Sequence, residues 1–190
     1  NLHDFKLLGG FSQEWAHTNT LSAGRKVLLL DGIEVIDAGT DEITNGGSAE
    51  EWALRSFFGR INYNYDEKYL LEANVRYDGT SRFAKDNRWG CFPSFSAGWN
   101  FSKEKFMSFA DPVLQMAKLR ASWGELGNQN VGDNFYPYLV AIESVDKAYP
   151  IGNQLNTGFQ QIALGNKNIK WETIRMLNIG VDFALFNNRL

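Results

Sequence analysis

Apolar and polar residues alternate with a period of two along several parts of the chain, the pattern of a β-strand with one apolar face. In segment 57–65 the odd-numbered residues are aromatic, aliphatic or glycine, and most of the even-numbered residues are polar. The same alternation resumes in segment 69–77, after the three-residue polar link Asp66–Lys68. Two such arms joined by a short polar link predict a β-hairpin.

Four further segments show this alternation, although the second face of the first one is mixed. They are 5–11, 95–101, 119–123 and 177–185. Together with the hairpin, they predict about six strands, most with one apolar and one polar face.

The connections between these strands alternate between short and long. Long irregular loops rich in Gly, Asn, Asp and Thr are expected near 16–51, 78–90 and 127–170. A compact soluble domain rarely carries loops of this length, whereas a barrel of the bacterial outer membrane has short turns on one side and long loops on the other. The turn at Asp66–Lys68 is therefore expected on the periplasmic side.

Two of the connections contain a local signal of their own. Within the first long loop, two short apolar runs flank Asp31-Gly32, which predicts a small hairpin from Val27 to Ile36 with a type I′ turn. Between the fourth and fifth strands, a short helix is expected around Lys103 to Phe109, ended by Pro112.

Aromatic residues gather near both ends of the predicted strands, as in the interfacial girdles of a membrane barrel. Tyr63, Tyr65 and Tyr69 surround the short turn, and Tyr77 and Trp171 belong to the opposite end. A β-sandwich also lines one face with aromatics, but its loops are usually shorter. The pattern favours an all-β fold, an antiparallel segment of a large transmembrane β-barrel, with a soluble carbohydrate-binding β-sandwich as the alternative.

Composition narrows the class of protein further. Mean hydropathy is -0.33, and the longest apolar run, 135–142, is far shorter than the ~18 residues of a membrane helix. Strands that cross a membrane need only one apolar face, so this low average agrees with a barrel. The net charge of -3 argues against nucleic acid, which requires a basic surface.

No catalytic motif is present, and we expect a protein that is not an enzyme and has no cofactor. Cys91 is the single cysteine. His3 and His17 lie in different segments, without the spacing of a metal-binding motif. The adjacent acids Glu50 and Glu51 are not placed to flank a glycosidic bond. Segment 128–134 offers oxygen ligands for Ca²⁺ but lacks the acidic ladder of an EF-hand, so no metal site is expected.

Several motifs are specific enough to indicate a family. They follow in order as RINYNY, KYLLEANVRYDGTSRF, RWG, FPSFSAGW, KLRASWGELGNQ, NIKWE and NIGVD, and together cover most of Leu54 to Leu190. They resemble the SusC/RagA family of TonB-linked outer-membrane proteins, the TonB-dependent receptors. Residues 1 to 50 are similar only in general style.

The resemblance implies a nutrient importer in the outer membrane of Bacteroidetes-type bacteria, with an oligosaccharide or a peptide as solute. Such proteins are large barrels closed by an N-terminal plug domain, they pair with a SusD-like surface lipoprotein, and TonB drives them. Residues 1–190 are therefore expected to be a partial barrel, an excerpt without the plug domain or the TonB box. An energy-independent porin is a second alternative.

The polar strand faces and the loop aromatics are the candidate functional surfaces. Charged residues such as Arg60, Glu72 and Arg76 share the polar faces and are expected to form cross-strand pairs, with contact to a plug as the other possibility. Aromatic loop residues are candidates for stacking on the solute, or alternatively for packing the loops together. They are Trp89, Phe135, Tyr136, Tyr138 and Tyr149.

Overall fold

The computed structural model describes residues 2–28, 32–33, 35–110, 113–132, 135–152 and 154–185. Its main element is a six-stranded sheet in the order β1-β2-β3-β4-β5-β8, and every neighbouring pair is antiparallel. The six predicted strands are confirmed. They are β1 (His3–Leu28), β2 (Gly39–Tyr65), β3 (Tyr69–Thr80), β4 (Trp89–Asn100), β5 (Leu114–Asn128) and β8 (Glu172–Leu185).

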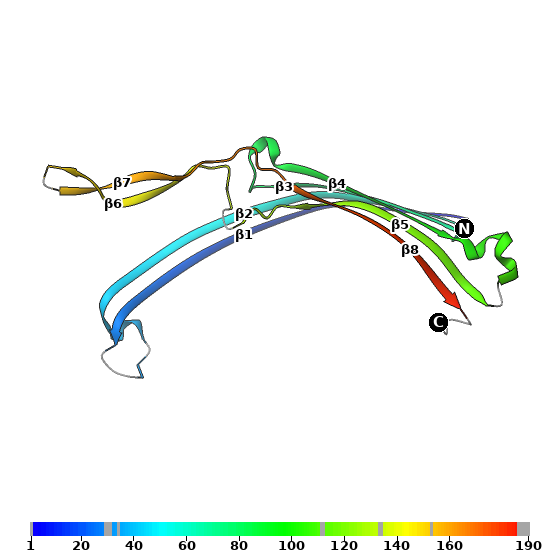
Figure 1. The fold of residues 1–190 in the computed structure, drawn as a ribbon, viewed down its shortest axis with the longest axis horizontal. Helices are drawn as coiled ribbons and strands as arrows, with labels where there is room; N and C mark the ends of the chain where they lie inside the picture. Colours follow the sequence, from blue (N-terminus) through cyan, green and yellow to red (C-terminus); the bar gives the residue numbers. More distant parts are fainter. Residues whose placement is uncertain are drawn as a thin grey trace.

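The sheet is arched, and its connections separate into two ends (Figure 1). At one end, which we call the turn end, lie the start of β1, the end of β8, the turn after β2, and the 3₁₀ helices η3 (Phe101–Lys103) and η4 (Lys105–Ala110). At the other, the loop end, the β1–β2 ribbon and the hairpin of β6 (Ala141–Ile151) and β7 (Gln154–Ala163) extend beyond the sheet. Among the described residues, no helix has the length and apolar character needed to cross a membrane.

The register places apolar residues of all six strands in common rows on one face, which we call the outer face. One row across the sheet is Leu7, Ile61, Ala73, Phe95, Trp123 and Leu177. The adjacent row, on the inner face, is Lys6, Asn62, Glu72, Ser96, Ser122 and Asn178. Each strand contributes to both rows because neighbouring residues of a strand point to opposite faces.

The outer face is uncovered. Ile61, Leu71, Val75, Leu119 and Val181 are all exposed, and the buried hydrophobic residues of the described chain are Phe83, Phe92 and Ala117. A β-sandwich would bury such rows against a second sheet, so the sandwich alternative is wrong. An apolar face of this extent is suited to lipid, whereas in water it would be an aggregation surface.

The prediction of an irregular loop near 16–51 is wrong. β1 and β2 remain paired from Phe11 opposite Phe57 to Leu28 opposite Gly39, with one register shift between Gly24 and Lys26. Backbone hydrogen bonds between the two strands stabilise this Gly-, Ser- and Thr-rich stretch. Pairing of this kind requires no alternation of apolar residues, so the sequence pattern did not reveal it. Of the small predicted hairpin, residues 29–31 and 34 lie outside the described residues. Its second arm is wrong because Ile36 begins the 3₁₀ helix η1 (Ile36–Ala38).

The other predicted connections are also more ordered than expected. Between β3 and β4 only residues 81–88 connect the strands, including the 3₁₀ helix η2 (Lys85–Asn87), because the pairing continues to Gly79 opposite Trp89. The third long loop contains the β6–β7 hairpin, which the sequence pattern did not predict. The short helix expected around Lys103 to Phe109 is present as η3 and η4, which are 3₁₀ helices.

Candidate functional site

The β3–β4 connection folds tightly at the loop end of the sheet. The backbone N–H of Ser81 donates to the carbonyl of Ala53 at 2.9 Å, and the Ser81 hydroxyl accepts from the N–H of Ala53 at 2.9 Å. Thr80 donates its N–H to the carbonyl of Arg88 at 3.1 Å, which closes the connection. These bonds continue the sheet beyond the last paired residue and fix the position of the next residue, Arg82.

Arg82 is a buried cation held between two aromatic rings. Its guanidinium carbon lies 4.4 Å from the centroid of Phe135 and 5.1 Å from that of Trp52. The residue is 8% exposed, and its Nε has no hydrogen-bond partner in the described part of the chain. Burial lowers the pKa of Arg82. Two desolvated ring contacts offset part of the cost of burying this charge.

A second set of rings packs beside Arg82. Trp171 meets Phe83 edge-on at a centroid distance of 5.6 Å and Phe92 at 5.2 Å. Phe83 is completely buried. We call Trp52, Arg82, Phe83, Phe92, Phe135 and Trp171 the loop-end cluster. Trp52 and Phe92 have the parity of the polar rows, so the cluster lies on the inner face of the sheet.

The connection from β5 to β8 crosses this inner face. The Tyr136 hydroxyl donates to the carbonyl of Glu51 on β2. On the return path, the Asn87 side chain donates to the carbonyl of Lys167 at 2.9 Å. The two crossing stretches are joined where the N–H of Asn166 donates to the carbonyl of Pro137 at 2.9 Å. Contacts to β2 and to the β3–β4 connection therefore hold both ends of the predicted third loop.

The five predicted loop aromatics divide into different environments. Trp89 stacks on Tyr77 with centroids 4.8 Å apart and shares the outer face with it, so we interpret it as part of the apolar outer surface. Phe135 and Tyr136 pack at the loop-end cluster, and Tyr138 meets Tyr136 edge-on at 6.2 Å. Tyr149 lies on β6 and is 47% exposed.

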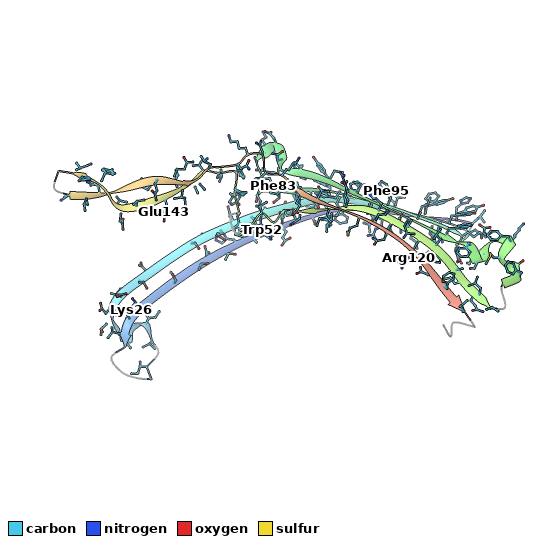
Figure 2. The ribbon with its side chains drawn as sticks, in the orientation of Figure 1. Lys26, Trp52, Phe83, Phe95, Arg120 and Glu143 are labelled. Atoms are coloured by element: carbon cyan, nitrogen blue, oxygen red, sulfur yellow. The ribbon has the colours of Figure 1, made fainter. Side chains whose placement is uncertain are left out.

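Four members of the loop-end cluster were missed by the sequence reasoning: Trp52, Arg82, Phe83 and Phe92. Phe92 gave a usable signal, because it is an aromatic residue at a polar position of its strand. Trp171 was assigned to an outer aromatic girdle, which is wrong because its ring packs on Phe83 and Phe92 at the inner face. Figure 2 labels Trp52 and Phe83 at this part of the sheet.

The polar inner face carries side-chain contacts both between β2 and β3 and along β3, but Glu72 bonds to asparagines and not to the expected Arg60 and Arg76. Arg60 donates through Nε to Asn74 at 2.5 Å, and Asn62 and Asn74 each donate to Glu72 at 2.8 Å. Arg76 forms an ion pair with Asp78 at 3.2 Å. A trough of about 700 Å³ runs over this face across all six strands, with Lys6, Glu72, Lys118 and Arg120 along it. Arg120 and the outer-face residue Phe95 are labelled in Figure 2.

The turn end has its own polar contacts. Glu104, between η3 and η4, accepts from the Tyr69 hydroxyl at 2.7 Å and from the Trp99 indole at 3.2 Å. These hydrogen bonds lower the pKa of Glu104. A bond from Lys103 lowers the pKa of Glu67 in the turn after β2. The contact between Lys103 and Glu67 joins the β4–β5 connection to the β2–β3 turn.

The side-chain arrangement offers binding surfaces. Within the described residues, no group of three or more His, Cys, Asp or Glu is placed to hold a metal ion. The free Cys91 is exposed on the outer-face parity of β4. Aromatic rings and buried arginine at one end, and a polar trough along the wall, are suited to lining a solute path.

Comparison with known protein families gives one match over nearly the whole chain. The family described as TonB dependent receptor-like, beta-barrel matches residues 3–190. The TonB-dependent receptor SusC of Bacteroides thetaiotaomicron is 35% identical over 99% of this chain and 18% of its own length. The TonB-dependent receptor P3 of Formosa agariphila is 34% identical over 99% of this chain and 18% of its own length.

Solved structures resemble this one in fold. A chain from the structure of the RagAB peptide transporter superposes with a TM-score of 0.82 at 26% identity, covering 98% of this chain and 20% of its own. A chain of the RagAB peptide importer in the closed-closed state gives a TM-score of 0.82 at 25% identity, with the same coverage. The present chain thus spans about a fifth of the length of the relatives that it matches.

Proposed function

Because this chain belongs to the β-barrel family of TonB-dependent receptors, we propose that it is the wall and outer mouth of a nutrient importer. The chain is part of a multi-pass barrel of the outer membrane. The observation that carries the proposal is the division of one sheet into an apolar outer face and a polar inner face, with a packed cluster at the loop end. The first face suits lipid and the second a path for solute.

The solute in this proposal is an oligosaccharide or a peptide. The peptide is supported by the structural likeness to the RagAB peptide transporter. Aromatic rings would stack on sugar faces or on peptide side chains equally well, so the loop end accommodates either class. Of the predicted aromatics, Tyr149 on the projecting hairpin is the one that we propose to contact solute directly, and Tyr138 is a second candidate.

Energy and partners come from outside the chain in this proposal. TonB would drive transport through an N-terminal plug domain, and a SusD-like lipoprotein would cover the loop end. The β6–β7 hairpin is suited to meeting such a lid because Ile142, Ile151 and Phe159 on it are all exposed. The chain contributes binding surface and wall, with no bond-breaking step.

Uptake by whole cells tests the proposal. A strain that lacks the full-length receptor should fail to grow on the cognate glycan or peptide, and the gene should restore growth. Uptake should stop when a protonophore dissipates the inner-membrane proton gradient. Uptake that continues with the protonophore would indicate an energy-independent porin, and equal growth of both strains on every solute would refute import.

The hairpin supplies a sharper variant. Excising residues 142–162 joins Ala141 to Ala163, which are already paired across the hairpin, so the rest of the connection is undisturbed. We expect a folded barrel, visible by its heat-modifiable gel mobility, with reduced solute capture or lid binding. Normal growth on limiting solute with the excised protein would remove the hairpin from recognition.

A further inference from the structure

The connection between β5 and β8 has two parts with different environments. Its base reaches β2, where Tyr136 binds the carbonyl of Glu51. In the sheet order, β3 and β4 lie between β5 and β2, so the chain leaving β5 must cross both strands. The β6–β7 hairpin beyond this base is exposed, with Phe159 at 80% and Ile142 at 66%. The base is held against the wall, whereas the hairpin projects from it.

One charged side chain lies beneath the crossing. Arg82 is in contact with Trp52 from the wall and with Phe135 from the crossing segment. Its Nε has no hydrogen-bond partner within the described residues. A buried guanidinium with an unpartnered Nε gains compensation from the ring faces that it contacts. Its stability in this position therefore depends on Phe135 staying in place, and the position of Phe135 depends on Arg82.

We infer that Arg82 is a positioning residue that clamps segment 135–139 onto the inner face, where this segment borders the solute path and determines which solutes pass. The last step of this inference rests on the proposed function. The clamp is specific to a guanidinium: its planar group stacks on two rings at once, whereas the ammonium of a lysine is a point charge. Solutes would therefore contact an ordered segment at this point, not a mobile loop.

Cleavage of the purified full-length receptor in detergent tests the clamp without any solute. Chymotrypsin would cut after Tyr138 only when the segment leaves the wall. Arg82→Ala should raise the rate of this cleavage about tenfold, because cleavage follows the population of the open segment. Arg82→Lys should fall between the wild type and Arg82→Ala. Lys85→Ala, in the same connection but exposed, is the matched control and should behave as wild type.

A double variant separates a clamp from general loosening. Trp52→Leu removes one of the two rings and should also accelerate cleavage. If both residues act through one stack, Arg82→Ala with Trp52→Leu should be cleaved no faster than the faster single variant. Cleavage of Arg82→Ala at the wild-type rate would overturn the clamp. A double variant whose increase in cleavage rate is the product of the two single increases would also overturn it.

Uptake measurements test whether the clamp at Arg82 affects which solutes pass. With equal amounts of assembled barrel, Arg82→Ala should raise the apparent KM for the cognate solute about threefold or more and leave the maximal rate per receptor unchanged. An unchanged KM would overturn the role in selection. If the wild-type receptor supports no uptake over the empty strain, the proposed function fails instead, and the cleavage results still decide whether the clamp exists.

Discussion

Trp171 donates its indole N–H to the backbone carbonyl of Arg88 at 3.0 Å, across 83 residues of sequence. Trp171 directly precedes β8 and Arg88 directly precedes β4, two strands that are not neighbours in the sheet. This bond, with the edge-on contacts to Phe83 and Phe92, brings the end of the longest connection to the end of a short one. The loop end is thereby a packed structure in spite of its length.

The first prediction concerns this bond. Trp171→Phe keeps a ring but removes the donor, which should destabilise the loop end by about 1 kcal/mol. Hydrogen exchange at residues 166–170 of the full-length receptor should accelerate, with the midpoint of barrel unfolding little changed. Trp123→Phe on the outer face is the control and should leave exchange there unchanged. Unchanged exchange in Trp171→Phe would show that the ring contacts alone hold the connection.

The strands of the sheet could be predicted because each has one face in a uniform environment. Ile61, Leu71 and Val75 alternate with polar neighbours since one side of the sheet is apolar along its whole length, and this periodicity is visible in a single sequence. The β1–β2 ribbon escaped prediction for the same reason. Beyond Trp15 neither of its faces is consistently apolar, so pairing by backbone hydrogen bonds leaves no periodic signal.

The loop-end cluster could be predicted only in part. Phe135 and Tyr136 were identified as loop aromatics, but their partners Arg82 and Glu51 come from the distant β3–β4 connection and from β2, and proximity of that kind follows from topology. Arg82 was identified within a family motif without a role. A buried arginine has no sequence signature of its own, because arginine is usually exposed.

The second prediction tests the two faces of the sheet with neighbouring residues of β4. Ala97 lies on the outer face between Leu71 and Ala121, and Ser96 lies on the inner face opposite Glu72. Ala97→Arg should cost about 2–4 kcal/mol of barrel stability in lipid, because the charge would face hydrocarbon. Ser96→Arg should cost far less, since Glu72 and water are within reach. Unfolding by guanidinium in lipid vesicles measures both; equal costs would contradict the assignment of the two faces, and a larger cost at Ser96 would mean that they are reversed.

The third prediction concerns the orientation in the membrane. Lys85 in η2 is at the loop end and Lys68 in the β2–β3 turn is at the turn end. In a background with Cys91→Ser, intact cells should be labelled by a membrane-impermeant maleimide at Lys85→Cys but not at Lys68→Cys, because long connections face outward. Labelling of both after permeabilisation confirms that each thiol is reactive. The reverse pattern in intact cells would invert the orientation.

The fourth prediction concerns acid at the turn end. Hydrogen bonds from the Tyr69 hydroxyl and the Trp99 indole lower the pKa of Glu104. The stabilisation from this carboxylate is therefore complete above the ordinary glutamate pKa of about 4.3 and is lost as the pH falls through the lowered folded-state value. The contribution of Trp99 to the fluorescence of the full-length receptor should stay constant from neutral pH to about pH 5 and change only at lower pH. Glu104→Gln should remove that change, and a transition near neutral pH in the wild type would contradict it.

The fifth prediction uses two adjacent glycines of β1. Gly10 is on the inner face, and the Phe58 ring lies across it so closely that an added β-carbon would overlap the ring. Gly9 is on the outer face, where an added β-carbon would have no heavy atom within 4 Å. The absence of a side chain at Gly10 allows Phe58 to lie flat on the wall, with the Arg76 guanidinium 5.8 Å from its centroid.

Gly10→Ala should therefore destabilise the barrel by about 1–3 kcal/mol, because Phe58 must leave its position and the contact with Arg76 is lost. Gly9→Ala should be neutral or slightly stabilising, since alanine restricts the unfolded chain and adds apolar surface on the lipid side. Guanidinium unfolding of the full-length receptor measures both variants. The cost of Gly10→Ala should largely disappear in a Phe58→Ala background, because the clash is with that ring alone. A cost that persists there would assign the requirement for glycine to the backbone of β1.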